Sequence, residues 1–146
     1  MKFSAPHDPT LRVLNLSIPA HRRHLPLLGA AVEAAAREAG ASADAAYAIN
    51  MAVVQAISAV LRYSGATELG CFELECIDAP DRIQVNIHDQ GPPWVSAQPQ
   101  AGQADTLQAF ELVRAMVDTL EYLPHANGNQ LRLSRLRTRP ALDDET

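Results

Sequence analysis

Residues 83–91, which read IQVNIHDQG, decide how the rest of the sequence is interpreted. Their branched apolar residues alternate with polar ones, a period of two that is typical of a strand with one buried face. Asp89 has the same parity as the apolar residues, so it is predicted to point toward the core. A carboxylate is costly to bury unless hydrogen-bond donors surround it. The strand therefore ends in an aspartate that needs hydrogen-bond donors around it, and Gly91 marks the point where the chain turns away.

The residues alone leave two interpretations of Asp89 open. In the first, its carboxylate accepts hydrogen bonds from the backbone of the turn that follows, as aspartates at strand ends often do. In the second, the carboxylate faces a cleft and receives a ligand. Both interpretations need the side chain to point inward, so orientation alone does not separate them.

Periodicity divides the rest of the chain into strand-like and helix-like segments. The strand-like segments are residues 11–18, 72–76, 121–124 and 129–136, and the helix-like segments are residues 21–39, 42–63 and a segment starting near 106. Ser42 or Asp44 is predicted to cap the second helix, and Thr106 or Asp105 the third. Tight turns are predicted at 78–81 and at Asn127-Gly128. About three helices covering one face of a mostly antiparallel sheet give an α+β, two-layer α/β sandwich.

The ends of the chain and one internal segment lack any period. Residues 1–10 and the acidic residues 138–146 are predicted to be flexible tails, which leaves 11–137 as one domain. Residues 90–105 are rich in proline, glycine and glutamine and are predicted to form a long loop. The 146-residue length fits a single compact domain.

Composition argues against several classes of partner. The formal net charge is −5 with no basic block, which disfavours nucleic acid. We find no apolar run of the ~20 residues that a membrane span needs, and no signal peptide, so we expect a cytoplasmic protein without a membrane partner. Cys71 and Cys76 lie five positions apart in a strand, an odd offset that sends them to opposite faces and excludes a bridge between them.

The order and spacing of these segments resemble the anti-sigma-factor serine kinases of the GHKL (histidine kinase-like) ATPase superfamily, which share the Bergerat fold. Residues 16–20 (LSIPA) are similar to that family's opening strand. Residues 89–94 (DQGPPW) look like its first glycine box, and residues 128–133 (GNQLRL) look like its closing strand. The resemblance covers residues 11–137 and implies an ATP-binding cleft between the helices and the sheet.

The resemblance also implies roles for particular residues. An aspartate at the position of Asp89 accepts from the adenine amino group, and the glycine at Gly91 lets the chain approach the base. The family's long helix carries a glutamate that acts on the attacking hydroxyl and, four residues later, an asparagine that binds Mg²⁺. Here those positions are Gln55 and Ala59. A neutral amide is no carboxylate base, and a methyl group offers no oxygen to a cation.

The family's second glycine box falls at residues 106–110, where Leu107 and Ala109 fill space that glycines leave open. ATP and Mg²⁺ are therefore not expected as cofactors, and no catalytic residue is assigned. We predict a degenerate anti-sigma-type regulator, or pseudokinase, that binds a sigma factor or an anti-sigma antagonist and forms a homodimer. The alternatives are an active ATP-dependent serine kinase that phosphorylates an antagonist, and a pseudokinase that binds nucleotide structurally.

Other candidate residues carry weaker signals. His21 and His24 have the spacing of two metal ligands, although a solvated polar helix start is favoured. Arg132 is predicted to face outward on the last strand, and Arg135, Arg137 and Arg139 lie near its end; an acidic partner could bind them, but a solvated edge is favoured. Trp94 is either an exposed anchor for a partner or a plug for an empty cleft.

Overall fold

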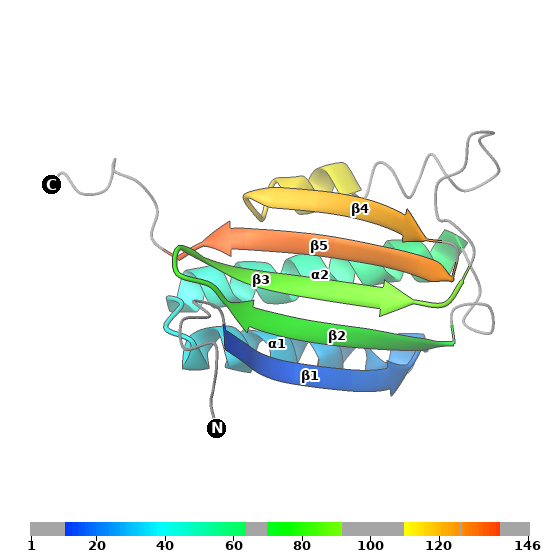
Figure 1. The fold of residues 1–146 in the computed structure, drawn as a ribbon, viewed down its shortest axis with the longest axis horizontal. Helices are drawn as coiled ribbons and strands as arrows, with labels where there is room; N and C mark the ends of the chain where they lie inside the picture. The colour runs from blue at the N-terminus through cyan, green and yellow to red at the C-terminus, as the bar shows by residue number, and fades with distance from the viewer. Residues whose placement is uncertain (1–10, 64–69, 92–109, 126, 138–146) are drawn as a thin grey trace, which may run out of the picture.

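The computed structural model describes residues 11–63, 70–91, 110–125 and 127–137. One layer is a five-stranded sheet with the order β1-β2-β3-β5-β4, in which every neighbouring pair is antiparallel (Figure 1). The strands are β1 (Leu11–Pro19), β2 (Cys71–Asp78), β3 (Arg82–Asp89), β4 (Thr119–His125) and β5 (Gly128–Leu136). The sheet leaves β1 and β4 as its two edges.

The second layer is helical and lies against one face of the sheet. It contains the short 3-10 helix η1 (Arg22–His24), α1 (Leu25–Glu38) and α2 (Ala43–Tyr63), and residues 110–114 are also helical. In Figure 1 the helices lie behind the sheet, α1 behind β1 and β2 and α2 behind β3 and β5. The predicted α+β two-layer sandwich with a mostly antiparallel sheet is confirmed.

The core lies between the two layers and follows the strand period. The apolar residues of β3 are at most 1% exposed, and Leu131 and Leu133 of β5 are equally buried. They meet the inner stripe of α2, which includes Ile49 and Ile57. Each fully buried side chain of this size contributes about 1.5–3 kcal/mol, so the alternation that predicted the strands is also what holds the helices on them.

The two long helices pack closely because their contact uses small residues. A Cβ added at Gly29 of α1 would lie 2.1 Å from Oδ1 of Asn50 in α2. The amide of Asn50 instead donates to Oε1 of Glu33 at 2.7 Å, which links the helices through a polar contact. Glycine at position 29 is what brings the helix backbones close enough for that bond.

The first helix begins later than its period indicates. Nδ1 of His21 accepts from the backbone N–H of Arg23 at 3.1 Å and caps η1, and the α-helix starts only at Leu25, with Pro26 in its first turn. The predicted start at residue 21 is therefore wrong, because a 3-10 turn precedes the α-helix. For α2, Oγ of Ser42 accepts from the N–H of Ala45 at 3.1 Å, so Ser42 is the cap.

The length of α2 corrects the statement that no apolar run is long enough for a membrane span. Residues 43–62 are long and apolar enough to cross a membrane, judged by length and composition alone. Half of that stretch is buried inside the fold. The core helix of a globular domain meets the same criterion, so the finding is weak evidence for a span.

Several predictions fall outside the described residues: both tails, the loop from residue 92 to 105, Trp94, and the cap at Asp105 or Thr106. The tight turn at 78–81 is confirmed, since the N–H of Ala79 donates to the carbonyl of Arg82 at 3.0 Å. The cysteine prediction is confirmed too. Cys76 is buried, Cys71 is half-buried, and both are free thiols.

Candidate functional site

Asp89 ends β3 as a buried carboxylate, only 3% exposed. Its Oδ1 accepts two hydrogen bonds, from the N–H of Gly91 at 2.8 Å and from Nδ2 of Asn129 at 2.9 Å. The first bond is the strand-end contact that the structural interpretation of Asp89 predicts. The second arises because the sheet register places Asp89 opposite Asn129. Charge-assisted bonds of this kind offset the cost of burying the carboxylate.

Asn129 extends this contact into a buried polar chain. Its side chain is 1% exposed, and its Oδ1 accepts from the hydroxyl of Tyr122 at 2.7 Å. Its Nδ2 also lies 3.4 Å from the carbonyl of Gly91. The chain from Tyr122 through Asn129 to Asp89 thus connects β4, β5 and β3. Sequence reasoning missed Asn129, although its place just after the predicted hairpin turn put it within reach of Asp89.

Gly128 brings β5 against the end of β3. Its φ is +149°, and an added Cβ would lie 1.9 Å from the carbonyl oxygen of Asp89 and 3.0 Å from Cα of Gln90. Both neighbours are backbone atoms, which do not swing aside as a flexible side chain does. A glycine is therefore required here both by conformation and by space.

The remaining predicted positions, Gln55 and Ala59, lie one turn apart on α2. Gln55 is half-buried, whereas Ala59 is completely buried. Arg62, near the end of the same helix, is exposed and donates to Oγ of Ser58 at 3.2 Å. Of the predicted site residues, the structure joins Asp89 and Gly91 directly, through the hydrogen bond between them. Leu107 and Ala109 lie outside the described residues.

A hollow of about 510 Å³ lies at the same end of the sheet but on its opposite, open face. Glu73, Glu75 and His88 line it, and these residues have the parity that points away from the helices. Asp89, Gly128 and Asn129 form its wall toward the strand ends. Glu73, Glu75 and His88 therefore place this hollow toward the face away from the helices, whereas the cleft that the resemblance implies lies between the helices and the sheet.

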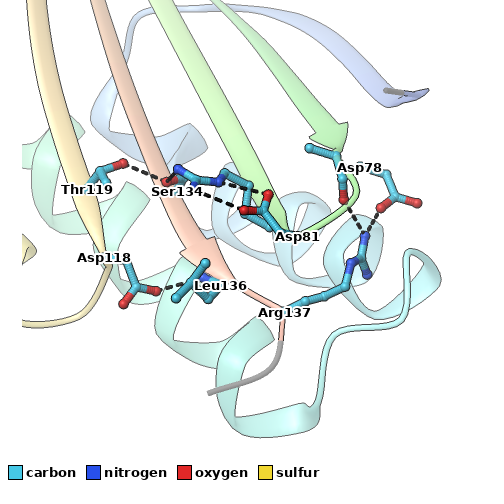
Figure 2. Close-up of polar contacts among 9 residues, drawn as sticks. Asp78, Asp81, Asp118, Thr119, Ser134, Leu136 and Arg137 are labelled. Atoms are coloured by element: carbon cyan, nitrogen blue, oxygen red, sulfur yellow. Dashed lines mark hydrogen bonds and ion pairs between the residues drawn. The ribbon is translucent and has the colours of Figure 1, made fainter. Parts of the chain in front are cut away.

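The far end of the sheet is closed by charged residues. Arg137 donates from Nη1 to the carbonyl of Ala39 at 2.7 Å and from Nη2 to that of Ala79 at 3.1 Å, and it forms an ion pair with Asp78 (Figure 2). Asp118 accepts from the N–H of Leu136 at 2.7 Å. The solvated edge predicted for Arg137 is wrong, because its side chain is only 23% exposed and bridges three segments.

Arg135 is also tied down, since its Nη1 donates to the carbonyl of Met116 at 2.7 Å. His21 and His24, on either side of Arg22 and Arg23, contact residues close to them in the sequence. Their ring centroids lie 6.2 Å apart, and Nδ1 of His21 accepts a backbone N–H. Within the part of the chain that the structure describes, no group of three His, Cys, Asp or Glu side chains is placed to hold a metal.

Among the described residues, the resolved pKa shifts lie on the sheet and its β2–β3 turn. Burial raises the pKa of the Cys76 thiol to about 11. The hydrogen bond and charge of Arg82 lower the pKa of the exposed Asp81 carboxylate. Both residues belong to the sheet and its turn, so neither provides an acid or a base for the cleft.

The comparisons with known proteins agree with this architecture. The family model of the histidine kinase-like ATPase domain matches residues 18–135, and the chain belongs to this family. Its fold is similar to the crystal structure of the RsbU and RsbW domains of Rv1364c from Mycobacterium tuberculosis, with a TM-score of 0.63 and 17% identity. The match covers 91% of this chain and 34% of that one, so this chain spans about a third of its length. A search of curated proteins found no match.

Proposed function

We propose that this chain is a regulatory protein of the anti-sigma type, which acts by binding another protein and has no kinase activity. One observation carries the proposal. At the position where the family it resembles has its Mg²⁺-binding asparagine, this chain has Ala59, whose methyl group is completely buried. One turn earlier, at the position of the catalytic glutamate, it has the neutral amide of Gln55.

The physical argument concerns what phosphoryl transfer requires. The reaction depends on a metal that neutralises charge on the phosphates and on a residue that orients the nucleophile. A hard cation needs oxygen ligands, which alanine does not have. A carboxamide does not accept a proton near neutral pH, so Gln55 does not serve as a general base. With Gln55 and Ala59 at these positions, α2 supplies neither the general base nor the metal ligand.

The contacts of Asp89 support a structural reason for keeping this residue in a domain without catalysis. Its Oδ1 is engaged by the N–H of Gly91 and the amide of Asn129. These bonds tie the end of β3 to the start of β5. A buried carboxylate with such partners stabilises the fold whether or not adenine ever reaches it.

For the partner, the resemblance favours a sigma factor or a small antagonist domain whose serine an active relative phosphorylates. In this proposal the exchange of partners is the regulatory switch, it takes place in the cytoplasm, and the chain works as a homodimer. ATP and Mg²⁺ are not part of the working cycle.

The test is an assay of binding and chemistry on the same samples. The chain is incubated with sigma factors and antagonist domains from its own genome, with γ-labelled ATP and Mg²⁺, and complexes are separated by size exclusion. We expect a stable complex in which no serine is labelled. Labelling of an antagonist serine by the wild-type chain would overturn the proposal in favour of an active kinase.

A second candidate function is structural nucleotide binding, which one observation favours. Asp89 and Gly91, which the resemblance assigns to the adenine side, are joined by a hydrogen bond, and Gly128 lies against the backbone of Asp89. A ligand that binds only the folded state raises the melting temperature. A rise with ADP that disappears in Asp89→Asn would support this candidate, and the absence of any rise would exclude it.

A further inference from the structure

The hollow on the open face is built from residues that the sheet register sets side by side. Glu73 of β2 pairs with His88 of β3, and Glu75 pairs with Asn86 one row further along. Asn15 of the edge strand β1 lies opposite Glu75 and also lines the hollow. The viewer of Figure 1 looks onto this face of the sheet.

Hydrogen-bond acceptors dominate its lining. Glu73 and Glu75 contribute two carboxylates, of which Glu75 already accepts from Nδ2 of Asn86 at 3.2 Å, and Asn15, Gln90 and Asn127 contribute side-chain amides. No lysine or arginine is among the lining residues of this part of the described structure. The volume of about 510 Å³ falls within the ~300–1,000 Å³ of typical ligand sites. Such a lining attracts a cation that donates several hydrogen bonds.

The nearby arginines are held elsewhere. Arg132 is next to Asn86 in the same row of the sheet, but its Nε donates to Oδ1 of Asn86 at 3.3 Å and its Nη1 pairs with Glu121 at 3.3 Å. Arg82 pairs with Asp81 at the opposite end of β3. Within the described residues neither cation reaches Glu73, so this carboxylate is available to a cation from outside.

We propose that this hollow receives an arginine side chain from a partner protein. A guanidinium group is planar, carries five N–H donors in a fixed fork and matches a carboxylate in two-pronged contacts. In the hollow it would bond Glu73 and lie beside the His88 ring. Charge complementarity favours this occupant, because the chain itself has a net charge of −5 and the lining contains two carboxylates.

The inference builds on the proposed function, since it names the face and the chemistry with which this protein-binding module docks a partner. The two are nevertheless tested separately. Labelling of an antagonist serine overturns the proposed function without touching the open face. Failure of arginine to bind the hollow overturns only the present inference.

The experiment is an amide NMR titration of the full-length, isotope-labelled chain. The probe is a short blocked peptide that contains two arginines, and the matched control is the same peptide with citrulline, which keeps the shape but not the charge. We expect shift changes centred on Glu73, His88 and Asn15 with the arginine peptide, weakening as salt increases. The citrulline peptide should leave these signals unchanged.

Two variants locate the effect. Glu73→Gln removes a carboxylate for which the described residues show no hydrogen bond or ion pair, and it should weaken binding about threefold to fivefold, the range of an exposed ion pair. Glu111→Gln removes an acid that is 74% exposed on the 110–114 helix and should leave the affinity unchanged. Equal responses to both peptides, shifts centred elsewhere, no shifts at all, or equal losses in both variants would each overturn the inference.

Discussion

The two ends of the sheet are closed in different ways, although the same strands reach both. At the end where β2 turns into β3, the guanidinium of Arg137 bridges Asp78 and the carbonyls of Ala39 and Ala79. At the other end, β5 touches β3 through backbone atoms, because Gly128 has no side chain. The first closure is made by a long charged side chain, which has room to adjust. The second closure depends on the absence of a Cβ atom at Gly128, and it borders both the candidate cleft and the open-face hollow.

The largest expected loss of stability comes from adding a Cβ atom at position 128. Gly128→Ala puts a Cβ against the carbonyl of Asp89 and should destabilise the fold by roughly 4 kcal/mol, from strain and overpacking together. Urea denaturation measures it. Gly40→Ala is the matched control at the opposite end, since Gly40 also has a positive φ, +102°, but its Cβ would meet only Nη1 of Arg137 at 3.5 Å. That variant should lose about 1 kcal/mol, and equal losses would contradict the contrast.

Cys76, in the middle of β2, reports on the buried core between the two ends of the sheet. Its pKa is raised from 9.0 to about 11 by burial. A raised pKa in the folded state means that the folded protein keeps its proton while the unfolded chain loses it. Stability should therefore fall as pH rises from 9 to about 11, by on the order of 2 kcal/mol at about 1.4 kcal/mol for each pKa unit.

The measurement is denaturant unfolding of the wild type and Cys76→Ala across that pH range. At neutral pH the wild type should be more stable, because alanine leaves a cavity. That advantage should shrink between pH 9 and 11. A difference that stays constant over the range would show that the thiol does not titrate as its burial requires.

Removal of the charged bridge should cost less than the Gly128 change. Arg137→Ala leaves Asp78 and two carbonyls without their partner and should lose about 2 kcal/mol. The control is Arg114→Ala, which removes an arginine that is 52% exposed and pairs with Glu111 at 3.5 Å. That exposed pair is worth about 0.5 kcal/mol or less. Similar losses in the two variants would mean that the bridge contributes no more than a surface ion pair.

The smallest effect is expected for Asp89→Asn. The amide keeps an oxygen that accepts from Gly91 and Asn129, so these two bonds lose their charge assistance, about 1 kcal/mol. Partner binding by the folded variant should be unchanged if the cleft is unused. Loss of the partner from a folded Asp89→Asn sample would show that the cleft end takes part in regulation after all.

The sequence predicted most of the cleft end but not the opposite end. The parity of β3 placed Asp89 inward, and the Asn127-Gly128 signal placed the turn that returns β5 beside it. Both follow from local rules about strands and turns. The backbone contact of Gly128 with Asp89 was beyond these rules, because it depends on how two distant segments meet in space.

The role of Arg137 was predicted wrongly for the same reason. Near the end of a strand, an arginine looks like a solvated residue, and its partners at Ala39 and Asp78 lie 98 and 59 positions away. The open-face hollow was also missed. Glu73, Glu75 and His88 each look like ordinary outward strand residues, and only the register of β2 with β3 gathers them.

The central claim is that α2 lacks the groups that bind the cation and activate the nucleophile. Calorimetry of ATP binding, once with Mg²⁺ and once with EDTA, tests this claim most directly. The wild type should show no gain in affinity from Mg²⁺, whereas a Gln55→Glu, Ala59→Asn double variant, if folded, supplies oxygen ligands and serves as the comparison. A wild-type chain that binds ATP tightly only in the presence of Mg²⁺ would contradict the account.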